Sequence, residues 1–388
     1  MPTTSNQNEK TFLRSITRRE FLRLAALTGL LAGCGPVVTP VAPFSATPAP
    51  TVTASPAATH TPVPATTHTP MPAATPTVVS IKSGLRRPDI IKMFPAAPSQ
   101  VVHTKHAGVW SGDALVPGAI REMLDASITK LTGLNDSKQA WEALFQPNEK
   151  IAIKVNAFTN SRIWTHVPLA KAVTDSLLNA GIPAEQIVVF DFTSAELETA
   201  GFKINKDGPG VRVYGTDGDY ASKIQVGANN TTRLSNVLLN SDALINIPIL
   251  KSHMIAGMTF ALKNQYGTVD NPDGLHNVGN ALPGLNALPE IKQRTRLVIG
   301  DLLEACLNHS NGYPYWKSDF KGDSIFMSYD PLAHDTVGLN MLKDLKTARG
   351  DDPTYNLGLS KAWFENAGKL GLGAHDAKDI QLTEIALK

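Results

Sequence analysis

The sequence predicts an α/β fold in which a mostly parallel sheet is covered by helices on both faces. Short apolar, β-branched runs alternate with segments of helical periodicity along residues 79–388. Most of these runs are apolar throughout, as expected for strands that are buried on both faces of a parallel sheet. A part of about 300 residues can form one large domain or two joined α/β lobes.

The first 33 residues have the organisation of an export signal. The pair Arg18 and Arg19 precedes a short apolar run, 24–31, which is too short to span a bilayer. Paired arginines before such a run are typical of twin-arginine signals. The ending LAGC resembles a bacterial lipobox, in which the cysteine is lipidated. We therefore expect export by the Tat translocase and a lipid anchor on Cys34 that holds the protein at the outer face of the cytoplasmic membrane.

The mature chain is nearly neutral. Cleavage after residue 33 removes five of the 36 Lys and Arg residues and two of the 34 Asp and Glu residues, which leaves 31 and 32 and a net charge of −1. The remaining chain has no clustered basic run, so we expect no nucleic-acid partner. Only Cys306 remains besides Cys34, which argues against a disulfide, an iron–sulfur cluster or a cysteine-rich zinc site. We expect Cys306 to be a buried apolar residue.

Residues 34–78 are predicted to form a disordered spacer. Pro, Thr, Ala and Val dominate this segment, and THTPVPA at 59–65 recurs as THTPMPA at 67–73. A segment of this composition cannot bury enough apolar surface to fold, and its prolines favour an extended polyproline II conformation. The predicted organisation is therefore a signal peptide at 1–33, a spacer at 34–78 and a folded part at 79–388.

The folded part is read as alternating strands and helices. We expect strands at 151–155, 187–190, 211–214, 243–249, 296–299, 324–327 and 380–385, and helices at 117–132, 167–180, 256–266, 331–345 and 360–370. In the second helix, Leu169, Val173, Leu177 and Leu178 fall on one face, and Gly181 ends the helix.

Polar side chains follow most of these strands. They are Lys154 and Asn156, Asp191, Lys251 and His253, Asp301, and Asp330 and Asp335. Ligands bind beyond the carboxyl ends of the strands of a parallel sheet, where residues distant in sequence come together. We therefore expect a binding site at this edge.

The stretch 244–267, LINIPILKSHMIAGMTFALKNQYG, predicts an anion site. An apolar strand ends at Lys251 and His253, and the helix expected at 256–266 has a free N-terminus that favours anions. Lys154, Lys251 and Lys263 would supply charge, and Asn156 and Asn264 would orient the ligand. His253, Lys251 and Lys263 are the candidate catalytic residues, with His253 as general acid or base. Alternatively, the three lysines extend over an apolar edge with their amines in water.

A second constellation would bind a divalent metal. His253, His276, Asp301 and Asp335 offer imidazole and carboxylate ligands, which such a metal prefers where thiols are missing. No compact spacing such as His-x-x-x-His accompanies them. His276, Asp301 and Asp335 are also candidate ligand-binding residues of the anion site.

Several segments together resemble the domain of unknown function 362 family. They are KVNAF at 154–158, DALINIPILKSH at 242–253, MTFALKNQYGTV at 258–269, His276, IGD at 299–301, DPLAHDTVG at 330–338 and LGLGAHD at 370–376. The resemblance covers roughly residues 100–388. Many relatives carry ferredoxin-type cysteine motifs, which this sequence lacks. The resemblance implies the fold boundary and the site map, but no activity.

The sequence is best interpreted as an exported α/β lipoprotein that binds, or acts as an enzyme on, an anionic small molecule. One alternative is a non-catalytic solute-binding lipoprotein with a cleft between two lobes. Another is a metal-dependent enzyme that uses the His and Asp ligands. An adhesion module would not need charged groups at so many strand ends.

Overall fold

The computed structural model describes residues 99–158 and 160–388, and all of these lie in one compact unit of the chain. The predictions for residues 1–78, including the signal peptide, the spacer and the anchor at Cys34, lie outside the described residues. Within the described part, no helix has the length and the apolar character that a membrane span requires.

One ten-stranded sheet runs through the described part. Eight strands lie in the order β16 (Ile380–Leu387), β1 (Ser99–His106), β15 (Phe320–Ser328), β13 (Thr295–Cys306), β10 (Ala243–Asn246), β4 (Ile151–Lys154), β6 (Ile187–Phe190) and β7 (Arg212–Val213). On this path only the pairings of β15, with β1 and with β13, are antiparallel. The predicted mostly parallel sheet is therefore confirmed.

The other strands are short additions to this sheet or separate hairpins and pairs. β11 (Ile249–His253) pairs with β13 and with β12 (Gly257–Thr259). The described residues also form three two-stranded sheets: β2 (Trp110–Ser111) with β3 (Ala114–Leu115), β5 (Ser161–Arg162) with β14 (Trp316–Lys317), and β8 (Tyr220–Val226) with β9 (Asn230–Ser235).

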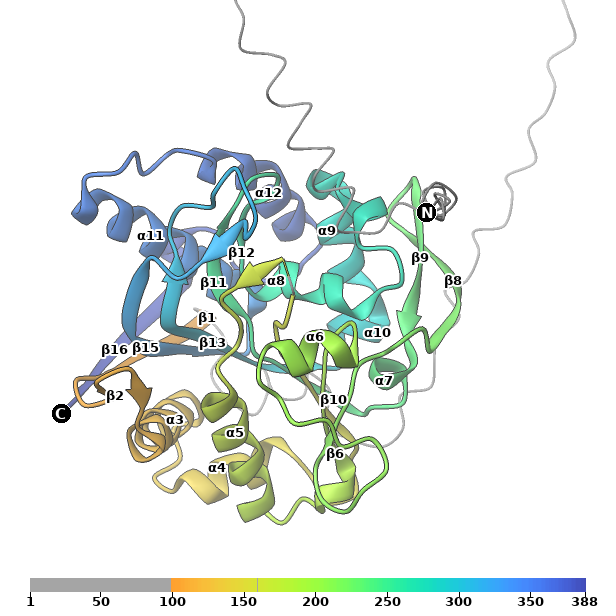
Figure 1. Cartoon of the computed structure of the whole chain (residues 1–388), viewed down its shortest axis with the longest axis vertical. Helices are drawn as coiled ribbons and strands as arrows, with labels where there is room; N and C mark the ends of the chain where they lie inside the picture. The colour runs from red at the N-terminus through yellow and green to blue at the C-terminus, as the bar shows by residue number, and fades with distance from the viewer. Residues whose placement is uncertain (1–98, 159) are drawn as a thin grey trace, which may run out of the picture. The chain divides into compact units, whose positions relative to one another are not determined.

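Helices cover both faces of the sheet (Figure 1). The α-helices are α3 (Pro117–Thr132), α4 (Ser137–Leu144), α5 (Val167–Asn179), α6 (Ser194–Thr199), α7 (Asn236–Leu239), α8 (Ala261–Asn264), α9 (Val278–Ala287), α10 (Pro289–Lys292), α11 (Pro331–Arg349) and α12 (Lys361–Lys369). Short 3₁₀ turns are η2 (Ala184–Gln186), η3 (Gln265–Thr268), η4 (Asp273–Leu275), η5 (Leu357–Ser360) and η6 (Ala377–Asp379).

Each face of the sheet has its own apolar core. In β4, Ile151 and Ile153 pack into the core under α3, α4 and α5, whereas Ala152 packs into the core under α9, α11 and α12. This is the alternation expected of a strand covered on both sides. Lys154 lies two residues after Ala152 in the same strand, so its side chain leaves the sheet on the same face, which α11 covers. One continuous sheet joins both cores, in place of the two α/β lobes that the sequence also allowed.

The predicted helices at 117–132 and 167–180 match α3 and α5 closely, and Cys306 is buried as expected. On α5, Leu169, Val173 and Leu177 are buried, but Leu178 is 39% exposed because it lies at the edge of the apolar face.

The prediction of a helix at 256–266 is wrong for its first residues. Residues Gly257–Thr259 form β12, which returns antiparallel to β11, and α8 begins only at Ala261. Gly257 has a φ of +80°, and an added Cβ there would lie 2.8 Å from the backbone nitrogen of Ser360. Because glycine has no Cβ, Gly257 can adopt this left-handed conformation and lie close to the backbone of Ser360, which allows the turn. The helical pattern of the sequence did not reveal this turn.

Candidate functional site

The order of the strands reverses at β4. From β4 the chain adds β6 and β7 on one side and then β10 and β13 on the other. In α/β sheets such a reversal opens a crevice at the carboxyl ends of the strands, where ligands bind. β4 and β10 end there at Lys154 and Asn246, and the chain continues from β10 into β11, which carries Lys251 and His253.

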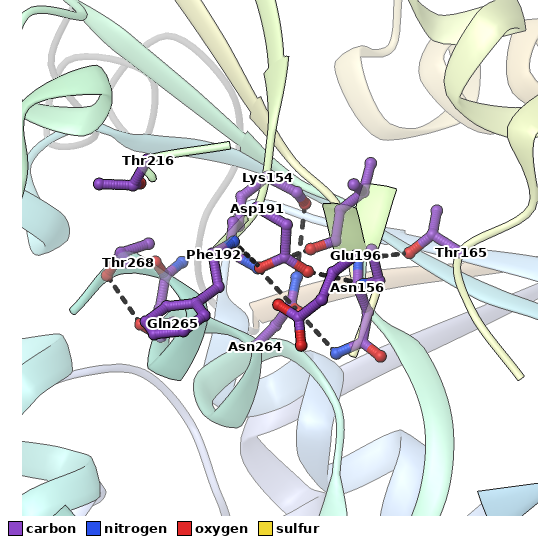
Figure 2. Close-up of polar contacts among 12 residues, drawn as sticks. Lys154, Asn156, Thr165, Asp191, Phe192, Glu196, Thr216, Asn264, Gln265 and Thr268 are labelled. Carbon is purple, nitrogen blue, oxygen red and sulfur yellow. Dashed lines mark hydrogen bonds and ion pairs between the residues drawn. The ribbon is translucent and has the colours of Figure 1, made fainter. Parts of the chain in front are cut away.

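A buried ion pair lies at this edge of the sheet (Figure 2). The Lys154 Nζ lies 2.5 Å from the Asp191 Oδ1, and both side chains are buried. Asp191 also accepts hydrogen bonds from the backbone N–H groups of Ala157, at 2.6 Å, and Phe192, at 2.8 Å. Gly267 packs directly on the pair, because an added Cβ would lie 2.1 Å from the Asp191 Oδ1. The charge of Lys154 is therefore balanced inside the protein.

A chain of side-chain amides links this pair to β11. Asn156 donates to Asn264 Oδ1 over 3.0 Å, and Asn264 donates to Asn246 Oδ1 over 2.7 Å. The Lys251 amine donates to Asn156 Oδ1 over 2.8 Å. Figure 2 shows Asn156 and Asn264 beside Lys154 and Asp191. The two asparagines thus orient Lys251.

Four basic side chains gather beside these amides, and we call them the Lys–His cluster: Lys251, His253, Lys263 and His276. The His253 ring centroid lies 6.3 Å from that of His276 and 5.1 Å from that of Trp316. The Lys251 amine lies 5.8 Å from the Trp316 ring, and the Lys263 amine lies 4.0 Å from the ring of Tyr266. Lys251, His253 and Lys263 are buried, whereas His276 keeps 15% of its side chain exposed. The cluster therefore combines positive charge with aromatic walls.

His253 is held in its neutral form. Its Nδ1 accepts hydrogen bonds from the backbone N–H groups of Ile255, at 3.1 Å, and Ala256, at 3.2 Å, which places the proton on Nε2. Burial lowers the pKa of His253 well below its ordinary value, and the positive charges of Lys263, His276, His309 and Lys251 lower that pKa further. A neutral imidazole with an Nε2–H group is a hydrogen-bond donor at neutral pH.

The N-terminus of α8 is occupied by a side chain of the protein itself. Asp335 accepts hydrogen bonds from the backbone N–H groups of Ala261, at 2.6 Å, and Leu262, at 2.9 Å. The anion expected at this helix start is thus the carboxylate of Asp335, which caps the helix that carries Lys263. A free anion site at this terminus is not what the structure shows.

Asp301 contacts His166, a histidine outside the Lys–His cluster. Its carboxylate accepts hydrogen bonds from the backbone N–H of His166, at 2.8 Å, and from the His166 ring, at 2.9 Å. The other ring nitrogen of His166 lies 3.3 Å from Glu304. Burial opposes protonation, but the charge of Asp301 and the hydrogen bonds to Asp301 and Glu304 raise the pKa of His166 to about 10. His166 is therefore an imidazolium between two carboxylates.

The four residues proposed as metal ligands are divided among three places. His253 and His276 are neighbours in the Lys–His cluster, Asp301 binds His166, and Asp335 caps α8. No group of three or more His, Cys, Asp or Glu residues that could hold a metal ion occurs in residues 99–158 and 160–388. Within these ranges, the four residues therefore form no single metal-ligand group.

Three residues of the site were not predicted from sequence. In the sequence, Asn246 lies inside the strand expected at 243–249 and Tyr266 lies at the end of the helix expected at 256–266. The fold brings Asn246 to Asn264 and Tyr266 under the Lys263 amine. His166 precedes Pro168 at the start of α5, and its contact with Asp301 spans 135 residues. The available signal for His166 was its position just before a predicted helix beyond β4.

Comparisons with known proteins support the family resemblance over the central region. A family model described as Domain of unknown function (DUF362) matches residues 151–340, which contain every member of the Lys–His cluster. No curated protein matches the chain. The N-terminal signal lies outside both the match and the described residues.

Two solved structures are weakly similar. One is a protein from Thermotoga maritima, with 13% identity, a TM-score of 0.34 and coverage of 67% of this chain and 60% of that one. The other is the lactate racemase apoprotein from Thermoanaerobacterium thermosaccharolyticum, with 8% identity, a TM-score of 0.30 and coverage of 55% and 52%. This chain thus spans less than two thirds of the length of each of these two proteins, and no activity is transferred from them.

Proposed function

We propose that the Lys–His cluster binds an anionic small molecule. The observation that carries this proposal is the gathering of Lys251, Lys263 and His276 around the buried His253, at the point where the strand order reverses. Burial lowers the pKa of His253, and the three neighbours lower it further because their charges oppose a further proton. An anion placed among them interacts favourably with every one of these groups.

The parts of the cluster have different roles in this proposal. The amines of Lys251 and Lys263 hold the anion, and the Nε2–H of His253 donates a hydrogen bond to one of its oxygens. His276 is the most exposed member, so we expect the ligand to approach the cluster from its side. Asn156 and Asn264 position Lys251, and Lys154 stabilises the crevice through Asp191.

An enzymatic role is favoured over simple solute binding. The amines and the His253 donor are fixed in a buried site, where they stabilise negative charge that develops on a substrate oxygen more strongly than in water. His253 would act as a neutral donor rather than as a general base, because its Nδ1 is already an acceptor for two backbone N–H groups. In the described residues one ten-stranded sheet runs through the whole compact unit, whereas the solute-binding alternative would use a cleft between two lobes.

We also propose that the protein acts outside the cytoplasmic membrane, where the Tat translocase delivers it and a lipid on Cys34 anchors it. The twin-arginine pair and the LAGC sequence support this location. The Cys34→Ala substitution should move the protein from the membrane fraction to the soluble exported fraction. A Cys34→Ala protein that stays in the membrane fraction contradicts the lipid anchor.

Ligand-induced stabilisation tests the anion site. Thermal and urea unfolding would be measured with phosphate, sulfate and a series of mono- and dicarboxylates. An anion at a hundred times its dissociation constant should add about 2.7 kcal/mol to the unfolding free energy of the wild type. Lys251→Met and Lys263→Met should remain folded and lose most of this increment.

The control for this experiment is Lys378→Met, which removes an exposed lysine far along the chain from the cluster and should keep the full increment. If both cluster variants respond to the anion as the wild type does, the cluster is not the binding site. If His253→Ala loses a bound divalent metal while both Met variants retain it, the metal alternative is correct instead.

A further inference from the structure

A cavity lies at the same edge of the sheet, beside α5. Its volume is about 410 Å³, and it is lined by Trp110, Asp113, Leu115, His166, Pro168, Glu304 and Lys321. Trp110 and Leu115 come from the β2–β3 hairpin, His166 and Pro168 from the start of α5, and Glu304 and Lys321 from β13 and β15. None of these residues belongs to the Lys–His cluster.

Two opposite charges face this cavity without forming an ion pair with each other. Glu304 and Lys321 are directly opposite in the antiparallel pairing of β13 and β15, where side chains of opposite charge normally meet. Instead, Glu304 is bound to His166 at 3.3 Å, and Lys321 donates to Gly112 O at 2.8 Å and Asp113 Oδ1 at 3.1 Å. Separate partners thus hold the two charges apart.

Both charges remain available on the cavity side. Glu304 keeps 31% of its side chain exposed and Lys321 keeps 45%. The hydrogen bond from His166 holds the pKa of Glu304 below its ordinary value, so this carboxyl group is ionised at neutral pH. The Lys321 amine lies 4.4 Å from the centre of the Trp110 ring, and this cation–π contact helps to fix the position of the amine.

Three further wall residues provide an apolar surface. Leu115, Pro168 and the indole of Trp110 are all partly exposed residues that line the cavity between the two charged groups. The Trp110 Nε1–H donates to Gly322 O at 2.7 Å, so the indole is held by the backbone of β15. Besides the His166 imidazolium, which holds Glu304, and the Asp113 carboxylate, which holds Lys321, the cavity therefore offers the Glu304 carboxylate, the Lys321 ammonium group and an apolar surface. Its volume suits a small molecule.

We propose that this cavity binds an α-amino acid with an apolar side chain. The ammonium group of the ligand pairs with Glu304, its carboxylate pairs with Lys321, and its side chain packs against Trp110, Leu115 and Pro168. The ligand bridges the cross-strand pair that the protein keeps separate. This second site stands independently of the anion site, because it uses none of the same side chains.

Calorimetric titration of the full mature protein tests the proposal with matched probes. L-Leucine and L-phenylalanine are the ligands. 4-Methylpentanoate, which is leucine without its ammonium group, and 3-methylbutylamine, which is leucine without its carboxylate, are the controls. We expect at least one of the amino acids to bind and both leucine analogues to bind about tenfold or more weakly than leucine, since each lacks one charge-assisted contact.

Two variants locate the binding. Lys321→Met and Glu304→Gln should each weaken amino-acid binding by about tenfold, whereas the exposed control Lys378→Met should leave it unchanged. Thermal unfolding without ligand shows whether each variant is folded, and Lys321→Met leaves the contact between His166 and Glu304 in place. The proposal is overturned if neither amino acid binds, if the amine alone binds as tightly as leucine, or if a folded Lys321→Met protein binds like the wild type.

Discussion

Lys154 and Lys251 leave the same edge of the sheet, yet their surroundings differ in charge. Lys154 is paired with Asp191 at 2.5 Å under Gly267, and that side of the crevice is electrically balanced. Lys251 lies with Lys263, His253 and His276. Burial depresses the pKa of His253, and the charges of Lys263, His276 and Lys251 depress it further. A lysine at the end of an apolar strand can thus be held in a balanced ion pair or lie among other basic side chains, as in the proposed binding site, and its neighbours from distant strands decide which.

The largest expected difference between the two lysines is in stability. Lys154→Met leaves the buried Asp191 carboxylate without its cation, which should lower the unfolding free energy by about 3–5 kcal/mol. Lys251→Met removes the hydrogen bond to Asn156 but leaves the buried Asp191 carboxylate with its cation, so it should cost about 1 kcal/mol. Urea unfolding of both variants measures the contrast. Equal, small losses would show that Lys154 is not a structural residue.

Gly267 provides a second way to disturb the Lys154 side alone. In Gly267→Ala, the new Cβ would lie 2.1 Å from the Asp191 Oδ1 and 2.5 Å from the Lys154 amine, so the pair must shift. We expect a loss of about 1–3 kcal/mol in the unfolding free energy. The control is Gly118→Ala in α3, where no atom lies within 4 Å and the helix should gain slightly. A neutral Gly267→Ala would contradict the tight packing of the pair.

The smallest expected effect is on the pH dependence of stability. The pKa of folded His253 lies below that of the unfolded chain, which is about 6.5. Between these two values the unfolded chain binds more protons, so this histidine makes the unfolding free energy fall as the pH drops below about 6.5. In His253→Asn this contribution should vanish. Wild-type and variant curves that run parallel from pH 7 to pH 5 would show that His253 is not depressed.

Much of the framework was predictable from residue patterns. α3, α5 and the strands β4 and β6 follow directly from local periodicity, because each presents a long apolar face or a fully buried run. The gathering of Lys251, His253 and Lys263 near Asn156 and Asn264 was predicted as well, since parallel strands end at one edge.

The partners of these side chains were not predictable in the same way. Nothing local shows that Asp191 pairs with Lys154, that Asp335 fills the N-terminus of α8, or that Asp301 binds His166 instead of joining His253. Each contact joins segments that are far apart in sequence and depends on the order of the strands. The turn at Gly257 was missed because the apolar positions after it also fit a helix.

Titration of His253 with and without a bound anion tests the central claim most directly. Nitrogen-15 NMR of the histidine rings would follow the protonation of His253, assigned by comparison with His253→Asn, in the presence of the anion that stabilises the protein most. The anion should raise the pKa of His253 markedly, because its negative charge offsets those of Lys263, His276 and Lys251, while the pKa of the distant, buried His103 should not move. An anion that stabilises the fold but leaves the titration of His253 unchanged would place the binding site elsewhere and contradict the account.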